Sequence, residues 1–139
     1  MKKLSFSLCL LLIICACNSS DKKMNKNSTL KTQGFLEGKA IYNDFCIQCH
    51  MANGEGVTNT FPPLAKSDYL MNKRLESIKA IKYGLSGEIT VNGVKYNTAM
   101  ASQGLSNKEI ANVMNYIKNS WGNKNTSLIT EEEVSKVER

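Results

Sequence analysis

One pentapeptide, Cys46-Ile47-Gln48-Cys49-His50, constrains the fold of this chain more than any other feature. Two cysteines separated by two residues, with a histidine directly after the second, are typical of covalent haem attachment. Each thiol adds to one vinyl group of the porphyrin, and the neighbouring imidazole is then held under the iron as the proximal ligand. The motif therefore predicts one haem linked through Cys46 and Cys49, with His50 on its iron.

Other interpretations of the cysteine pair fit less well. A thioredoxin-like redox pair belongs to a βαβ unit and does not require the histidine, and a structural zinc site needs four protein ligands. The sequence holds one histidine, and its three other cysteines all precede residue 18. A chance match in a surface loop is the remaining alternative. We find no paired catalytic carboxylates, phosphate-binding loop or nucleophile with its base that would indicate an enzyme of another class.

The amino-terminal residues have the pattern of an export signal. Two lysines precede an apolar run over residues 4–16, which is too short to span a membrane as a permanent helix. The sequence Ile14-Cys15-Ala16-Cys17 resembles the lipobox of bacterial lipoproteins. This resemblance implies cleavage after residue 16 and a lipid on Cys17, which would anchor the exported protein to a membrane on its periplasmic side. An ordinary cleaved signal that leaves a soluble protein is the alternative.

Composition divides the rest of the chain into three parts. Residues 17–33 are polar and rich in Lys, Asn and Ser, so we expect a flexible tether. Residues 34–122 should form the folded domain. Residues 123–139 are predicted to form a polar tail, to which we assign no function. We expect Thr130 to cap a short, frayed helix there. The net charge of +6 falls to +4 without the two signal-peptide lysines. This modest excess can steer docking to an acidic partner but is not typical of nucleic-acid binding.

Local patterns predict a mainly helical domain. Apolar residues at helical spacing indicate a first helix at 35–45, one or two helices from Ser67 to just before Gly84, and a last helix after residue 106. Ser106 and Glu109 form a capping-box pattern at the start of that last helix. Asn92-Gly93, between two short apolar triplets, predicts a hairpin with a type I′ turn.

The haem motif continues into a recognisable family pattern. Gly54 and Gly56 follow His50 in a CxxCHxxxGxG run, and Phe61-Pro62-Pro63-Leu64 comes next. With these motifs, residues 34–122 resemble a class I monohaem c-type cytochrome. The resemblance implies an all-α cytochrome c fold, with three to five helices around one covalent haem and a small hairpin before a distal methionine loop. It also implies that the first and last helices cross closely, with Gly38 against Tyr116.

The resemblance implies a hydrogen-bonded proximal ligand. In this family a proline carbonyl accepts the Nδ1–H of the proximal histidine, which here is His50. We assign that carbonyl to Pro63, with Pro62 as the alternative. Such a contact fixes the imidazole tautomer and raises its basicity.

The resemblance also implies a distal methionine on the other face of the haem. Met100 lies in the loop before the last helix, where the family places this ligand, and Met71 is the alternative. The family often has a proline directly after the distal methionine, whereas this chain has Ala101. We therefore expect a looser loop and a more labile iron–sulfur bond.

A haem with both axial positions filled predicts an electron carrier rather than an enzyme. We expect a monomer that shuttles electrons between a quinol-oxidising complex and a terminal oxidase or reductase, and no nucleic-acid partner. The sequence around the hairpin is also similar to haem domains fused to copper nitrite reductases and to subunits of haem-copper oxidases. Two alternatives are a haem subunit of an oxidoreductase complex and a ligand-binding sensor or enzyme in which Met100 is displaced.

Overall fold

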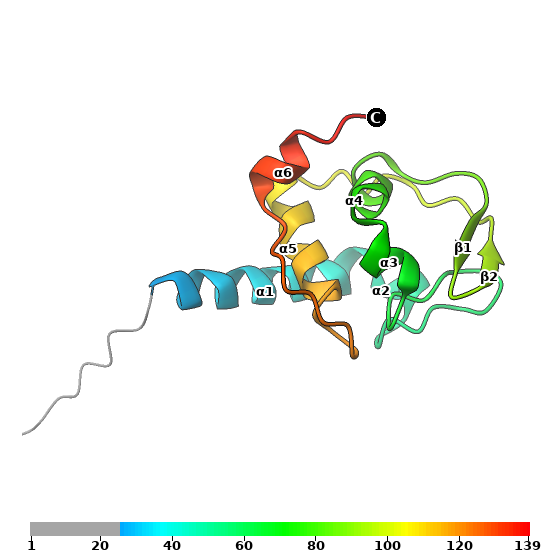
Figure 1. Ribbon diagram of the computed structural model, residues 1–139, viewed down its shortest axis with the longest axis horizontal. Coiled ribbons are helices and arrows are strands. Elements are labelled where there is room, and N and C mark those ends of the chain that lie inside the picture. Colours follow the sequence, from blue (N-terminus) through cyan, green and yellow to red (C-terminus); the bar gives the residue numbers. More distant parts are fainter. Residues whose placement is uncertain (1–25) are drawn as a thin grey trace, which may run out of the picture.

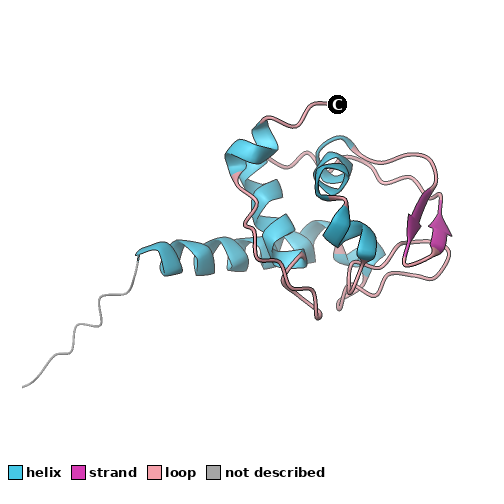
Figure 2. Cartoon of the chain, in the orientation of Figure 1, coloured by secondary structure: helices cyan, strands magenta, loops and turns pink. Residues whose placement is uncertain are grey.

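A computed structural model describes residues 26–139, with side chains from residue 31 onward. The predicted signal peptide at residues 1–16, Cys17 and the first part of the tether lie outside the described residues. Within them, the chain forms six helices and a two-stranded antiparallel hairpin (Figures 1 and 2). The elements are α1 (Lys26–Phe45), α2 (Ile47–His50), α3 (Asp68–Asn72), α4 (Arg74–Tyr83), β1 (Ile89–Val91), β2 (Val94–Tyr96), α5 (Asn107–Ile117) and α6 (Glu131–Ser135). The predicted all-α fold is confirmed, with one helix more than the three to five expected.

The closest contact between helices is the crossing of α1 and α5. A Cβ atom added at Gly38 would lie 2.1 Å from the Asn112 carbonyl oxygen and 2.9 Å from Tyr116 Cβ. Only a residue without a side chain lets the two backbones approach this far, which is the packing reason for a glycine inside a helix. The predicted contact between Gly38 and Tyr116 is confirmed.

Local capping signals define the other helices. The Ser67 side chain accepts a hydrogen bond from Leu70 N at the start of α3, and α4 ends at Gly84, which has φ +84°. Two helices therefore occupy the predicted region and end where predicted. At α5 the Ser106 side chain accepts from Glu109 N, and the Glu109 carboxylate accepts from Ser106 N, so the predicted capping box is confirmed.

The hairpin has the predicted turn and is fixed to α3. Asn92 and Gly93 both have positive φ, 51° and 80°, as a type I′ turn requires. An isolated two-stranded hairpin is only marginally stable, so it needs further contacts. Asp68 supplies them: its carboxylate accepts from Asn92 N at 2.7 Å, and its own backbone N–H donates to the Asn92 side chain at 2.9 Å.

The structure differs from the expected tether and tail. Helix α1 begins at Lys26, inside the segment expected to be flexible up to residue 33. At the other end, Thr130 does cap a short helix, and that helix packs on α5. Ile129, Val134 and Val137 are buried in the main core, because three well-spaced apolar side chains are enough to hold a short polar segment against a helix. In the described part of the chain, no helix combines the length and apolar character that crossing a bilayer requires.

Candidate haem site

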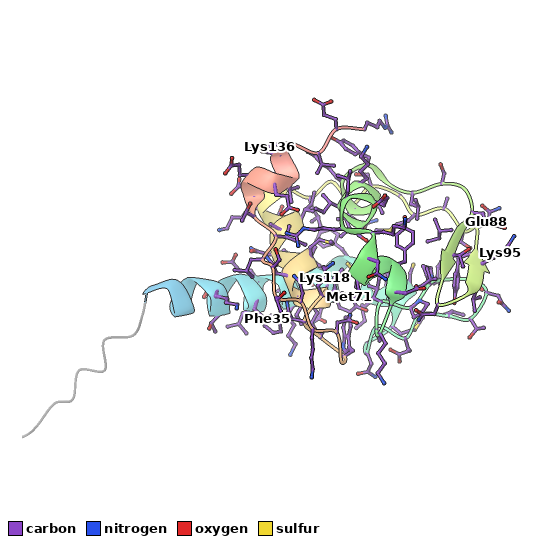
Figure 3. All side chains as sticks on the ribbon, viewed as in Figure 1. Phe35, Met71, Glu88, Lys95, Lys118 and Lys136 are labelled. Atoms are coloured by element: carbon purple, nitrogen blue, oxygen red, sulfur yellow. The ribbon has the colours of Figure 1, made fainter. Side chains whose placement is uncertain are left out.

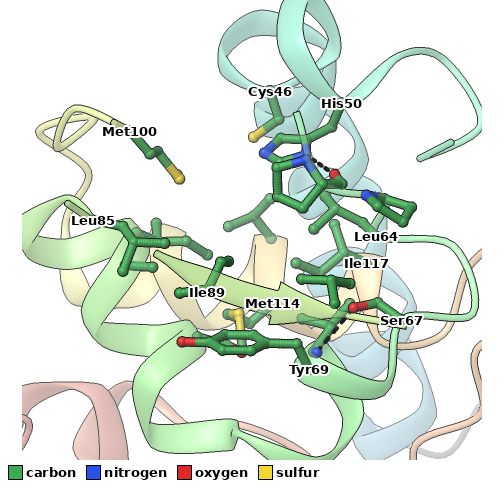
Figure 4. Close-up of a pocket in the computed structure, with 18 residues that line it drawn as sticks. Cys46, His50, Leu64, Ser67, Tyr69, Leu85, Ile89, Met100, Met114 and Ile117 are labelled. Carbon is green, nitrogen blue, oxygen red and sulfur yellow. Dashed lines mark hydrogen bonds between the residues drawn. The ribbon is translucent and has the colours of Figure 1, made fainter. Parts of the chain in front are cut away.

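A pocket lies between α2 and the loop that precedes α5. It has about 620 Å³ of empty space, including the open space at its mouth. Its walls come from α2, the 62–64 segment, α3, α4, β1 and α5 (Figure 4). Apolar side chains make up most of this lining, among them Leu64, Leu70, Ala80, Ile81, Leu85, Ile89, Val91, Val113, Met114 and Ile117. This size and lining are typical of cofactor pockets.

His50 enters the pocket in a fixed orientation. Its Nδ1 lies 2.9 Å from the carbonyl oxygen of Pro62, which can only accept, so Nδ1 carries the proton. The other ring nitrogen, Nε2, is thereby left with its lone pair on the pocket side (Figure 4). Burial lowers the pKa of His50, although the Pro62 hydrogen bond opposes the shift, and the lowered pKa favours the neutral imidazole that a metal ligand requires. The assignment of this carbonyl to Pro63 is wrong, because Pro62 makes the contact.

The glycines of the haem motif hold His50 in place. Gly56 N donates to His50 O at 3.0 Å, and Gly54 O accepts from Leu64 N at 2.7 Å. Both glycines have positive φ, and a Cβ at Gly54 would lie 2.5 Å from the ring of Trp121. The chain can therefore reverse direction within a few residues and bring the Pro62 carbonyl back to the imidazole.

The two cysteines of the motif differ in exposure. Cys46 lines the pocket and is half-buried, whereas Cys49 is exposed. Burial, together with the neighbouring Cys49, raises the pKa of the Cys46 thiol to about 11. Cys46 thus lies at the start of α2, and Cys49 lies within α2, directly before His50.

Met100 lies across the pocket from His50. Figure 4 shows its sulfur directed into the pocket. An isolated antiparallel bridge fixes its backbone, with Leu85 N donating to Met100 O at 2.8 Å and Met100 N donating to Leu85 O at 2.9 Å. The alternative, Met71, is on α3 beside Lys118 and is not part of the pocket lining (Figure 3). Met114 does line the pocket but is fully buried in the core on α5.

The donor set fits a porphyrin iron. One imidazole nitrogen and one thioether face the pocket from different sides, and the Cys46 thiol lies in its lining. The remaining lining is apolar, as the macrocycle requires. Within residues 31–139, no group of three or more His, Cys, Asp or Glu side chains could hold a bare metal ion.

Sequence reasoning missed three features of this site. It chose the wrong proline, and it did not identify the Leu85 bridge to Met100, which joins residues with no shared local pattern. It also gave Tyr42 no role, although its hydroxyl donates to Met51 O at 2.6 Å, directly after the haem motif.

Comparison with known proteins identifies the family. Residues 35–121 match the family "Cytochrome c". The chain is 40% identical over 110 residues to cytochrome c-552 of Thermus thermophilus, and the match covers 73% of this chain and 83% of the relative. It is 35% identical over 106 residues to the cytochrome c subunit of the quinone alcohol dehydrogenase of Gluconacetobacter polyoxogenes. That match covers 73% of this chain but only 22% of the larger subunit.

These matches agree with the pocket chemistry. A motif for covalent haem attachment opens onto an apolar pocket, and the family match spans that motif and the whole pocket lining. Members of this family bind haem c, an iron porphyrin, covalently and transfer electrons. The chain belongs to the cytochrome c family.

Proposed function

We propose that this chain carries one electron at a time on a single haem c, attached through Cys46 and Cys49 and ligated by His50 and Met100. The observation that carries the proposal is the convergence of Cys46, His50 Nε2 and the Met100 sulfur on one apolar pocket. Haem c, when bound, supplies an Fe(III)/Fe(II) couple. The His50 imidazole, held by the Pro62 carbonyl, and the Met100 thioether would be the two protein ligands of its iron, so electron transfer would need little rearrangement of the protein.

Covalent attachment is tested by expression with the cytochrome c maturation machinery. After denaturation, haem colour should stay with the wild-type polypeptide and be lost from a Cys46→Ser/Cys49→Ser variant. A colourless wild-type chain would contradict the proposal.

Axial ligation is tested on the same preparation. The oxidised protein should show the weak far-red methionine-to-iron charge-transfer band. Met100→Ala should abolish this band and allow the reduced protein to bind carbon monoxide. Met71→Ala is the matched control, because Met71 is outside the pocket lining, and it should leave both properties unchanged. Binding of carbon monoxide to the reduced wild-type protein would favour a sensor or an enzyme instead.

We propose that the carrier works outside the cytoplasm, as a monomer anchored through a lipid on Cys17. The support is the lipobox-like sequence at residues 14–17. Its partners would be redox proteins, a quinol-oxidising complex on one side and a terminal oxidase or reductase on the other. A Cys17→Ser variant should move from the membrane fraction to the soluble fraction, and mass spectrometry of the wild type should detect the lipid.

A second candidate is a permanent haem subunit of a dehydrogenase complex. The observation that favours it is the 35% identity to part of a quinone alcohol dehydrogenase cytochrome c subunit. Size-exclusion chromatography after detergent extraction separates the two candidates. A free carrier elutes alone, and a subunit elutes with a dehydrogenase.

A further inference from the structure

The segment after the family match is bound to the rest of the fold by many polar contacts. We call residues 123–139 the C-terminal strap. It contains α6 and buries Ile129, Val134 and Val137 in the core, and a second side of it lies against α4. Figure 1 shows it running back across α5 toward α4. Sequence reasoning assigned it no function.

The strap is hydrogen-bonded to both ends of α4. At the first residue of α4, the Arg74 guanidinium donates to the Glu133 carboxylate at 2.5 and 2.6 Å and to two strap carbonyls, those of residues 127 and 128. At the last turn, Lys82 Nζ donates to Val134 O at 2.8 Å and to Val137 O at 3.0 Å. The Tyr83 hydroxyl also donates to Val137 O, at 2.8 Å.

The same last turn of α4 holds the segment that carries Met100. The Ser102 hydroxyl donates to Lys82 O at 2.8 Å, and two backbone bonds join Leu85 to Met100. Gly84 lets the chain pass close by, since a Cβ there would lie 2.7 Å from Met100 O. Hydrogen bonds therefore join the strap to Lys82 and Lys82 to Ser102, and the chain directly after α4 is bridged through Leu85 to Met100, the proposed distal ligand.

We propose that the strap positions Met100, with Lys82 and Tyr83 as positioning residues; this inference rests on the proposed ligation by Met100. Ala101 leaves the segment after the methionine without a proline, so the restraint on the thioether comes from the end of α4. When the strap no longer holds that end, the thioether is displaced from the iron more easily. Covalent attachment of the haem on the other side of the pocket is unaffected.

The test compares two variants that each remove two hydrogen bonds from the strap. Lys82→Met removes the bonds of Nζ to the strap at the end of α4. Asn115→Leu is the matched control, since Asn115 exchanges two hydrogen bonds with the Ile129 backbone, at 2.8 and 2.9 Å, on α5. Both variants are made as the haem-loaded full chain, and imidazole is titrated against the oxidised protein at neutral pH while the methionine-to-iron band is recorded.

Lys82→Met should weaken the band and bind imidazole about three- to tenfold more tightly than the wild type, the range expected when hydrogen bonds that favour the closed state are lost. Lys82→Arg, which keeps the charge and the donors, should restore most of the wild-type affinity. Asn115→Leu should lower the unfolding midpoint and leave the imidazole affinity unchanged. Tyr83→Phe removes only the hydrogen bond to Val137 O and should raise the imidazole affinity by a smaller factor. This variant tests the proposal if Lys82→Met yields no haem protein.

The proposal is wrong if Lys82→Met leaves the band and the imidazole affinity at wild-type values, or if Asn115→Leu changes them equally. Failure of the proposed ligation looks different. In that case the wild-type protein itself lacks the band, or Met100→Ala leaves the spectrum unchanged, whatever the strap variants do.

Discussion

The two sides of the pocket are built differently. On the His50 side, residues within about fifteen positions of the motif supply the restraints: Tyr42 from α1, the Gly54 and Gly56 turns, and the Pro62 carbonyl. On the Met100 side, the backbone restraint comes from the end of α4, and α4 is itself held by a strap about fifty residues farther along the chain. Closing a short loop costs less chain entropy than closing a long one. The first side can therefore form from local contacts, whereas the second depends on the completed fold.

This difference suggests a division of roles. The proposed covalent bonds and the fixed imidazole belong to the locally organised side, where residues near His50 in the sequence hold it. The proposed thioether ligand belongs to the side that is held indirectly. Substitutions near α1 should therefore change global stability with little effect on ligation, and substitutions near the end of α4 should do the reverse.

The largest effect is expected at the crossing of α1 and α5. Gly38→Val should lower the unfolding free energy of the haem protein by about 3 kcal/mol, because its side chain would overlap the Asn112 carbonyl and force the helices apart. Denaturation in urea, followed by circular dichroism, measures this loss. Ala40→Val is the control on an exposed position of the same helix and should cost about 0.5 kcal/mol from helix propensity alone. Equal losses at the two sites would refute the close crossing.

A smaller loss is expected from Tyr42→Phe. Tyr42 is fully buried, and removing its hydroxyl leaves Met51 O without its 2.6 Å partner. Stability should fall by about 1–2 kcal/mol. Since Tyr42 acts on the His50 side, the methionine-to-iron band and the imidazole affinity should stay at wild-type values. A change in either would show that the two sides are coupled more closely than the contacts indicate.

The third effect depends on pH and concerns the strap. Its hydrogen bond from Arg74 holds the pKa of Glu133 below its usual range, so the carboxylate stabilises the fold above the unfolded pKa of about 4.3. That stabilisation is lost as the pH falls through the lower, folded-state pKa. Glu133→Gln should therefore lower the free energy of unfolding by up to about 1 kcal/mol at neutral pH, and should leave it unchanged well below pH 4. The loss is small because the Arg74–Glu133 pair is partly exposed. Urea unfolding of both proteins at the two pH values tests this, and a loss that persists in acid would exclude the ion pair as its cause.

Sequence reasoning succeeded where an interaction spans only a few residues. Three examples are the capping box at Ser106, the Asn92-Gly93 turn and the haem motif with its two glycines. In each of them, the residues that determine the local geometry all lie within one short stretch of sequence. The choice between Pro62 and Pro63 failed for a related reason. Both prolines line the pocket, and which carbonyl faces His50 depends on the backbone angles of this segment, which the Gly54 turn helps to set.

The sequence pattern did not predict that the strap packs against the core. Its composition is polar, and its three buried side chains, Ile129, Val134 and Val137, are too few to stand out as a periodic pattern. Its polar partners on α4 lie more than fifty residues away, so no local signal pairs Arg74 with Glu133. Composition describes a segment by itself, whereas burial depends on the surface that another segment offers it.

The smallest expected effect is a gain, from Ala101→Pro. Met100 is in an extended bridge with Leu85, the conformation that a residue before proline prefers, and Ala101 has no positive φ. The substitution should raise stability by about 0.5 kcal/mol by restricting the unfolded chain, and should weaken imidazole binding to the oxidised protein. Combined with Lys82→Met, it should recover part of the ligation that Lys82→Met loses, since a stiffer segment depends less on the end of α4. The proline could stabilise the fold without recovering ligation in the Lys82→Met background. In that case the segment after Met100 does not restrain the thioether, and the pocket walls must explain the contrast between the two sides of the pocket.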